Sequence, residues 1–282
     1  MKARMKIDWG LKAPAKPDLE RFGRYLRDKG YMPFTIENYQ DCLKRYLASG
    51  KTVPDFLEGL HNRHLARNTI NNYIIPIKAY HMMLGQPLDD LKILRKPEGI
   101  PYYFEEDDIR QIFGVMKNLK HKAMLYLMFY TCLRASELCS LDVEDIDLQK
   151  LILRIREGKG GKAGMIGFSN DCAAVMKDYL ESRPLMEIGG RNPLFYTDFG
   201  IRWNRKSLYR MFTKYKKKAG IQKKGGVHVF GRHSPASLMV SRGCDIRVIK
   251  EILRHKSIMT TMRYAHISER TVKEASEQYL KL

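Results

Sequence analysis

The chain has 282 residues, 44% of them hydrophobic and 29% charged, with a formal net charge of +20 at pH 7. This composition is typical of a soluble globular protein with one large or two medium domains, and the basic excess indicates a polyanionic partner. No apolar run reaches the length of about 18 residues that spans a bilayer, and the first residues, MKARMKIDWG, lack a signal-peptide core, so we expect a cytoplasmic protein without a membrane partner.

Residues 1–96 are predicted to form a four-helix domain. Apolar residues recur with helical period in four segments: 18–30, 35–50, 53–60 and a segment starting at Asn68. Thr35 is the expected N-cap of the second helix, and Pro76 is expected to kink the fourth. Such a domain is too small to be an enzyme alone but is suited to gripping a ligand.

Residues 97–282 are predicted to form a second domain, reached through an extended linker, KILRKPEGIPYY at 92–103. Its helices are expected at 104–117, 121–133 and 135–141. The segments LILRI and MIGF, separated by the turn EGKGGK, predict a β-hairpin. Everything from Asn170 onward is predicted to be helical.

Residues 202–224 contain ten Lys or Arg and no Asp or Glu. A solvated helix face is the ordinary interpretation of a charge run, yet such faces normally mix signs to gain pairing four residues apart. The single sign favours a helix that lies against DNA phosphates or in a major groove.

The turn EGKGGK is not a nucleotide-binding P-loop, because Ala163 follows Lys162 where that motif needs Ser or Thr, and because it joins two strands. We therefore expect no bound nucleotide. Lys159 stands at the tip of this glycine-rich turn, from which it could reach DNA or a scissile phosphate. Taken alone, Lys159 is better explained as an ordinary turn lysine.

Neither a disulfide framework nor a metal site is predicted. The five cysteines form an odd, scattered set, which indicates reduced thiols. His61 and His64 have a ligand-like spacing, but no Cys or carboxylate pair lies near them in sequence to complete a tetrahedral site.

Metal-free cleavage of a phosphodiester needs cations for the phosphate oxygens, a nucleophile, a proton acceptor and an acid for the leaving 5′-oxygen. Two arginines, a lysine, one or two histidines and a tyrosine supply all of these. The chain contains 16 Tyr and 8 His, so no single residue of these types identifies a site.

Four motifs, in order along the chain, resemble the tyrosine recombinases and integrases. CLRASELCSLDVEDIDL resembles the family's first arginine box, with Arg134 as its arginine and Glu137 holding the box in place. RIREGKGGK resembles the hairpin with the catalytic lysine. HVFGRHSPASLMVSRGCDIRVIKEILRHKSIMTTMRYAH resembles the second box, and TIENYQDCLKRYL with NTINNYIIPIKAY resembles the core-binding domain.

The second box matches the Xer branch in two spacings and departs from the family in two positions. His255 follows Arg232 by 23 residues, and Tyr264 follows His255 by nine. His228 lies four residues before Arg232 where the family usually has three, and we expect Gly231 to absorb the extra residue as a local bulge. Arg254 stands where the family usually has glycine.

The resemblance implies the tyrosine recombinase fold, which is mainly α. An N-terminal four-helix, SAM-like core-binding domain precedes an α-rich catalytic domain with a small β-hairpin or sheet. In the implied mechanism Tyr264 forms a 3′-phosphotyrosyl intermediate, and Lys159 protonates the leaving oxygen. Arg134 and Arg232 clamp the phosphate, while His228 and His255 hydrogen-bond it or take the tyrosine proton.

The resemblance also implies partners and a role. Strand exchange passes through a Holliday junction on double-stranded DNA at a dif-like site, with four subunits on two sites and no metal, ATP or other cofactor. The tail, residues 267–282, docks on a neighbouring subunit or folds back on its own domain. Xer-type resolution of chromosome dimers is favoured over integration of a plasmid or virus.

Two other functions stay open at this point. A type IB topoisomerase uses the same chemistry as a monomer that relaxes supercoils. A non-catalytic architectural DNA-binding protein would retain the fold and lose cleavage. Covalent trapping on a nicked DNA excludes the architectural protein, and strand exchange into a second duplex excludes a simple relaxing enzyme.

Overall fold

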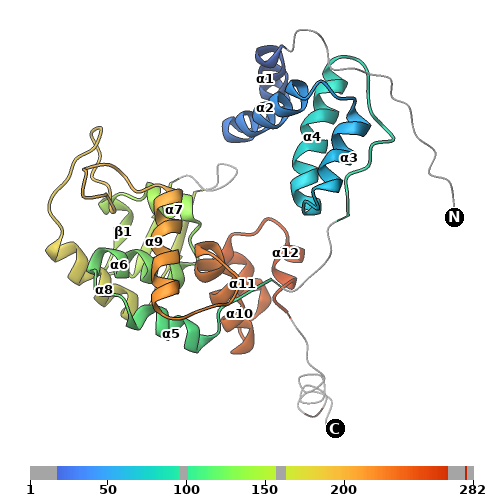
Figure 1. Cartoon of the computed structure of the whole chain (residues 1–282). Helices are drawn as coiled ribbons and strands as arrows, with labels where there is room; N and C mark the ends of the chain where they lie inside the picture. The colour runs from blue at the N-terminus through green and yellow to red at the C-terminus, as the bar shows by residue number, and fades with distance from the viewer. Residues whose placement is uncertain (1–17, 96–100, 157–162, 266–276, 278–282) are drawn as a thin grey trace. The chain divides into compact units, whose positions relative to one another are not determined.

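The computed structural model describes residues 18–95, 101–156, 163–265 and 277, and the chain divides into two compact units, Met1–Glu98 and Gly99–Leu282 (Figure 1). The division falls within the segment expected to be a linker. Helices dominate both units, and the described residues contain one small sheet. The predicted fold class, mainly α with a small β element, is confirmed.

The N-terminal unit consists of four helices: α1 Leu19–Asp28, α2 Pro33–Ala48, α3 Val53–Asn62 and α4 Arg67–Met83. Local sequence sets most of their ends. Side chains of Asp18 and Thr52 accept hydrogen bonds from the first turns of α1 and α3. The second helix begins at Pro33 and not after Thr35, since proline is well tolerated in the first turn. The fourth continues through Pro76 as one helix.

The core of this unit forms around α4, which packs against each of the other three helices. Phe22 of α1 and Tyr80 of α4 meet edge to face, with ring centroids 5.5 Å apart. Leucine, isoleucine and tyrosine side chains from all four helices fill the remaining space. The apolar residues whose spacing predicted the helices are thus the ones that pack them together.

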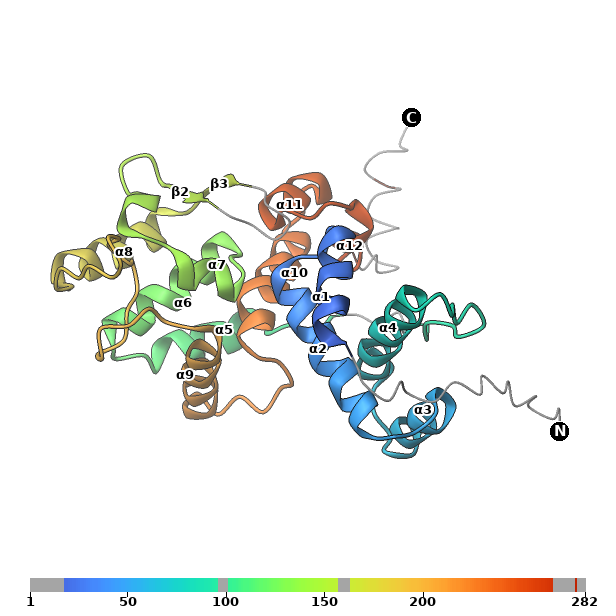
Figure 2. The same cartoon turned by 90° about the horizontal axis from the view of Figure 1, so that it is seen from above.

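The C-terminal unit is built around α6, Leu119–Thr131, which is buried on most of its circumference. It packs against α8, Asn170–Ser182, and the two lie side by side in Figures 1 and 2. The other helices of the unit are α5 Glu106–Gly114, α7 Ala135–Ser140, α9 Arg205–Lys218, α10 Ser234–Ser241, α11 Ile246–Leu253 and α12 Ile258–Met262.

The sheet has three antiparallel strands in the order β1 Ile146–Asp147, β2 Ile152–Ile155 and β3 Gly164–Gly167. The last two form the predicted hairpin, in which Ile155 pairs with Gly164 (Figure 2). The short first strand was not predicted. Lys159 belongs to residues 157–162, which lie outside the described residues.

The prediction that residues after Asn170 are all helical was wrong for residues 183–204, which form a loop. Prolines and positive-φ glycines in this stretch are incompatible with a helix. The loop is fixed by a backbone bridge between Asp142 and Pro193 and by Arg202, whose guanidinium donates to the buried Asp142 carboxylate. Asp142 therefore ties the loop to the segment that follows α7.

None of the helices within the described ranges is long and apolar enough to cross a membrane.

The buried His81 predicts an acid-sensitive N-terminal unit. Its side chain, on α4, is 1% exposed, and neither ring nitrogen has a hydrogen-bond partner among the described residues. Burial lowers its pKa below the usual value. As the pH falls below about 6.5, the unfolded chain takes up this proton and the folded chain does not, so stability decreases by at most about 1.4 kcal/mol per pH unit.

Urea unfolding at pH 7.5 and pH 5.5 checks this expectation. His81→Leu should lose less stability than the wild type between the two pH values, because it has no proton to take up at this position. The other histidines are present in both proteins and cancel in the comparison. Equal losses would show that His81 does not carry the effect.

Candidate active site

Arg134 is held by the carboxylate three residues after it. Arg134 is the N-cap of α7. Glu137, three residues later, turns its side chain back toward the start of the helix. Glu137 accepts the backbone N–H of Arg134 at 2.8 Å on Oε2, and Nη1 of its guanidinium at 2.6 Å on Oε1. The glutamate is buried, so this short motif fixes both the backbone and the side chain of Arg134.

The acidic residues after α7 fix the end of β2. Asp142 and Asp145 are both buried and accept hydrogen bonds from Arg156, at 2.7 Å and 2.6 Å. Because Arg156 is the last described residue before the segment that contains Lys159, this ion-pair cluster anchors the strand that leads to the predicted lysine.

Arg232 is buried between the C-terminal ends of two helices. Its Nη1 donates to the carbonyl of Cys132, the C-cap of α6, at 2.5 Å, and its Nη2 to the carbonyl of Leu253, at the end of α11, at 2.7 Å. Carbonyls at a helix C-terminus carry partial negative charge and lack partners within the helix. Burial, with the nearby charge of Arg134, lowers the pKa of Arg232 to about 10, so it is cationic at neutral pH.

His255 lies against the same guanidinium. Its Nε2 is 3.3 Å from Nη2 of Arg232, and its Nδ1 is 2.9 Å from the hydroxyl of Thr261. Arginine has only donors, so Nε2 accepts, and Nδ1 carries the proton donated to Thr261. Burial and the charges of Arg232 and Arg134 lower the pKa of His255 to about 4, so the ring is neutral at pH 7.

Tyr264 follows α12 and is buried in a cluster with Cys132, Ala236, Ile249 and Leu253. Two members of this cluster supply the carbonyls that bind Arg232, so the tyrosine packs directly beside that arginine's anchors. Burial raises the pKa of the Tyr264 phenol. The predicted nucleophile is therefore protonated at neutral pH and needs a proton acceptor.

The side chain that contacts the Tyr264 hydroxyl is His233, which was not among the predicted site residues. Its Nδ1 lies 2.6 Å from the Tyr264 hydroxyl. Burial, followed by the neighbouring His228 and by the charges of Arg263 and Arg232, lowers the pKa of His233 to about 4. A neutral imidazole can accept the phenolic proton. The sequence signal for this contact is the Arg-His pair itself, in which His233 directly follows Arg232.

The bulge expected at Gly231 is a π-helix, Val229–His233. A π-helix has more residues per turn than an α-helix. His228, four residues before Arg232, therefore lies near the position that a residue three before Arg232 would have in an α-helix. The His228 ring meets that of His233 edge-on, with centroids 4.9 Å apart. Desolvation of the ring and the charges of Arg232 and Arg134 lower the pKa of His228.

The structure thus brings five predicted residues into one neighbourhood: Arg134, His228, Arg232, His255 and Tyr264. The sixth, Lys159, falls outside the described residues. The described part of the chain contains no group of three His, Cys, Asp or Glu side chains arranged to hold a metal ion.

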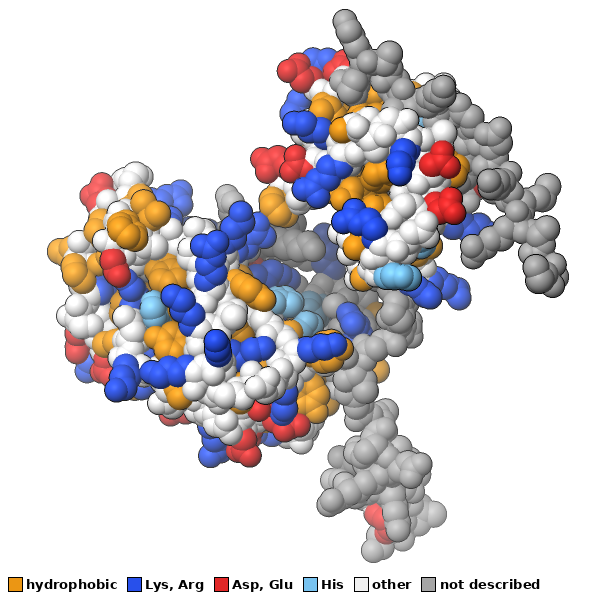
Figure 3. All heavy atoms as spheres, in the orientation of Figure 1, with side chains coloured by type: hydrophobic (Ala, Val, Ile, Leu, Met, Phe, Trp, Pro, Cys, Tyr) orange, Lys and Arg blue, Asp and Glu red, His pale blue; other side chains and the backbone are white. Residues whose placement is uncertain are grey.

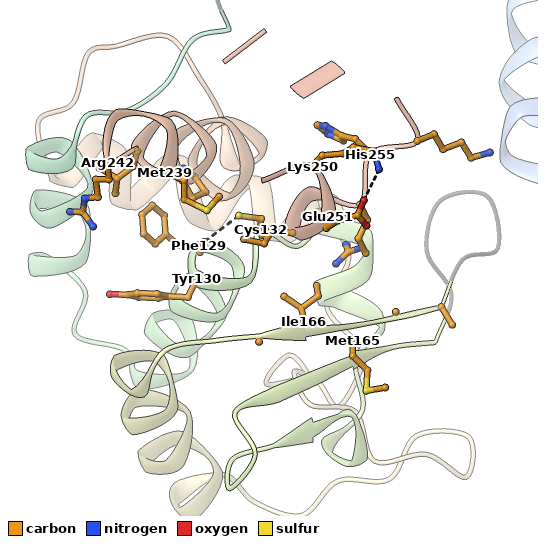
Figure 4. Close-up of a pocket in the computed structure, with 18 residues that line it drawn as sticks. Phe129, Tyr130, Cys132, Met165, Ile166, Met239, Arg242, Lys250, Glu251 and His255 are labelled. Carbon is orange, nitrogen blue, oxygen red and sulfur yellow. Dashed lines mark hydrogen bonds and ion pairs between the residues drawn. The ribbon is translucent and has the colours of Figure 1, made fainter. Parts of the chain in front are cut away.

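A cavity of about 750 Å³ opens beside this site. Figure 4 shows Met165 and Ile166 of β3 on one side of it and Lys250 and His255 on another. The strand that returns from the Lys159 turn therefore faces the end of α11 across this space.

Comparison with known proteins identifies the family. Residues 102–271 match the phage integrase family. The chain is 32% identical to tyrosine recombinase XerA of Pyrococcus horikoshii over 273 residues, which cover 92% of each protein. The chain belongs to the phage integrase family of tyrosine recombinases. It is therefore an enzyme that cleaves and rejoins DNA strands.

Other members of the family resemble the chain over most of its length. Tyrosine recombinase XerD of Oceanobacillus iheyensis is 27% identical over 93% of this chain and 97% of that protein. The crystal structure of a XerA recombinase matches 94% of this recombinase and 98% of that chain, with 27% identity and a TM-score of 0.57. The integrase of transposon Tn1549, at 18% identity and a TM-score of 0.72 over 92% of this chain and 98% of that one, shares the fold.

Gly231 is predicted to be required at the π-helix. A Cβ at this position would lie 2.6 Å from Cγ of Met128, a fully buried side chain of α6. Gly231→Ala should therefore lower the free energy of unfolding by about 1–3 kcal/mol, as overpacking of a core usually does. Urea unfolding measures the loss.

Gly114→Ala is the matched control, because a Cβ at Gly114 meets nothing within 4 Å. In a Met128→Ala background, the Gly231→Ala change should cost less than in the wild type, since the obstructing atoms are gone. A loss at Gly231 no greater than at Gly114 would contradict this interpretation.

Proposed function

We propose that this recombinase cuts one DNA strand at a specific site through Tyr264. The phenolic oxygen attacks the scissile phosphorus, a phosphotyrosyl bond forms at the 3′ end, and the bond to the 5′-oxygen breaks. The observation that carries the proposal is the hydrogen bond from Tyr264 to His233, the residue adjacent to the buried Arg232. Nucleophile, proton acceptor and phosphate-binding cation are thereby contiguous.

Arg134 and Arg232 are proposed to bind the non-bridging oxygens and to stabilise the charge that develops on them. The two guanidiniums differ in what supports them. Glu137 neutralises part of the charge of Arg134, whereas the acceptors of Arg232 are neutral carbonyls. Arg232 therefore keeps a full positive charge in a buried setting, where its attraction for a phosphate is strongest.

His233 is proposed to take the proton from Tyr264. A pKa of about 4 makes His233 a weak base before DNA binds. A bound phosphate brings negative charge next to the ring and will raise its pKa toward the useful range. His228 and His255 are proposed to hydrogen-bond the phosphate, and Lys159 to protonate the leaving 5′-oxygen.

Rejoining is proposed to reverse these steps on a different strand. The phosphotyrosyl ester retains the energy of the broken phosphodiester, so attack by a 5′-hydroxyl of the partner duplex needs no ATP. Successive exchanges of this kind pass through a Holliday junction.

Two surfaces are proposed to bind double-stranded DNA. On the C-terminal unit, α9 has seven basic and no acidic residues among its 14, and Figure 3 shows Lys and Arg side chains gathered over it. Uniform positive charge is suited to the phosphate backbone. The N-terminal four-helix unit is proposed to grip the same duplex as a core-binding domain, as its resemblance to that domain implies.

An Xer-type role is proposed from the named relatives. Several are XerA, XerC or XerD recombinases, and a XerH recombinase of the same fold is bound to a difH substrate. We infer a dif-like site, four subunits on two sites, and resolution of chromosome dimers for partition at cell division in the cytoplasm. The tail, residues 267–282, is proposed to dock on a neighbour or on its own unit. Integration of a mobile element is the second candidate, which the fold shared with the Tn1549 integrase favours.

Tyr264→Phe tests the nucleophile. On nicked fragments of the host's own genomic DNA, the wild type should form a denaturation-resistant protein–DNA band, and the variant should form none, because it has no attacking oxygen. Tyr102→Phe, which changes an exposed tyrosine, should behave as the wild type. A covalent band with Tyr264→Phe would refute the assignment, and mapping the cleaved sites would identify the target.

His233→Phe tests the proton acceptor. Cleavage should slow by about 10² to 10⁴, the usual contribution of a general base, while DNA affinity is retained. A substrate with sulfur in place of the scissile 5′-oxygen needs no proton on its leaving group, so it should not rescue this variant. Rescue by that substrate would instead assign His233 as the acid.

A further inference from the structure

Arg254 contacts the buried carboxylate that holds Arg134. Its Nη2 donates to Oε2 of Glu137, the same oxygen that accepts the backbone N–H of Arg134. Glu137 therefore receives donors from two arginines that are far apart in sequence, one before α7 and one after α11. Only 3% of its surface is exposed, so solvent contributes little to holding this carboxylate.

The neighbours of Arg254 contact the other phosphate-binding arginine. The carbonyl of Leu253 accepts from Arg232, and Nε2 of His255 lies against the same guanidinium. Three successive residues thus contact both arginines or their supports. Arg254 bonds to Glu137, which holds Arg134, and its two neighbours contact Arg232. A shift of this segment would therefore move the contacts of Arg134 and of Arg232 together.

The backbone at this position is strained for an arginine. Arg254 caps α11 with φ 51° and ψ 48°, the left-handed conformation that glycine adopts without cost. Its Cδ lies 3.5 Å from the place of a Cβ on Gly164, at the start of β3, so the side chain packs along the hairpin strand. Nε and Nη1 are buried with no hydrogen-bond partner among the described residues.

We propose that Arg254 is a positioning residue, which joins the Arg134–Glu137 pair to the Arg232–His255 pair and keeps both guanidiniums in register with one phosphate. This inference rests on the proposed function of the site. When a phosphate draws the Arg134 guanidinium toward itself, Arg254 continues to hold Glu137 from its other side. The carboxylate then remains a fixed support, and Arg134 cannot shift freely.

R254G is the first test, because glycine accepts the left-handed backbone and lacks the guanidinium. Single-turnover cleavage of a nicked DNA substrate should fall by about 10- to 100-fold, the range expected for a misplaced catalytic group, while DNA affinity at matched salt stays near that of the wild type. Urea unfolding monitors the fold. R254K, which keeps the charge and loses the forked geometry, should show an intermediate cleavage rate.

The pH profile separates positioning from a general loss of structure. Three cationic groups face Glu137: Arg134 at the start of α7, Arg254 after α11 and Arg232 in the π-helix. Losing Arg254 removes one positive charge, so the pKa of Glu137 should rise. The acid limb of the cleavage profile, to which the proposed base His233 and Glu137 both contribute, should then move to higher pH in R254G. R254K should show a smaller movement.

K256A is the matched control, because Arg254 and Lys256 flank His255 and Lys256 is exposed. Both variants remove a positive charge next to His255, whereas of these two residues Arg254 is the one hydrogen-bonded to Glu137. Unchanged cleavage and an unchanged acid limb in R254G, or an equal shift in K256A, would overturn the inference and leave the proposed function intact. A covalent band with Y264F would instead overturn the proposed function itself.

Discussion

The site depends on one buried cation, Arg232, set between the C-terminal ends of α6 and α11. Its hydrogen-bond acceptors there are main-chain carbonyls, which supply partial charge and no full negative charge. A carboxylate in their place would neutralise the guanidinium and weaken its attraction for phosphate. Carbonyl acceptors satisfy the donors, as a buried polar group requires, and leave the net charge available. The same two helix ends also position Tyr264, which packs against Cys132 and Leu253.

This arrangement concentrates positive charge at a place where few acidic side chains balance it. Glu137 is one carboxylate among Arg134, Arg254 and Arg232, and three histidines nearby have pKa values lowered by burial and by these cations. Such crowding costs stability in the absence of a ligand, and the phosphate of the proposed mechanism would relieve it. The histidines stay neutral at pH 7 until that phosphate arrives, so they do not add to the repulsion, and their basicity increases when DNA is in place.

Local signals in the sequence were sufficient for the fold class, most of the helices and the hairpin. The helix prediction for residues 183–204 overlooked local signals, the prolines and glycines of that stretch. It also could not include the long-range ion pair of Arg202 with Asp142. Motif resemblance pointed to Arg134, Arg232, His255 and Tyr264, which the structure places together. It missed His233, whose partner lies 31 residues away, and it noted Arg254 only as a departure. Neither contact can be derived from spacing, because each depends on how α11 and the π-helix pack.

The segment from Leu253 to Tyr264 connects the residues proposed to bind phosphate with the proposed nucleophile. It begins with a carbonyl for Arg232, turns at the left-handed Arg254, presents His255, and reaches the tyrosine after the single turn of α12. His255 is also bonded to Thr261 within that turn, so the imidazole that touches Arg232 is coupled to the helix that delivers Tyr264. In the proposed mechanism, a phosphate that shifts Arg232 acts on Tyr264 through the carbonyl of Leu253 and the ring of His255. It also acts through Cys132, whose carbonyl binds Arg232 and whose side chain packs in the same cluster as Tyr264. In the proposed mechanism the placement of Tyr264 therefore responds to the phosphate through contacts that Arg232 makes with the ends of both α6 and α11.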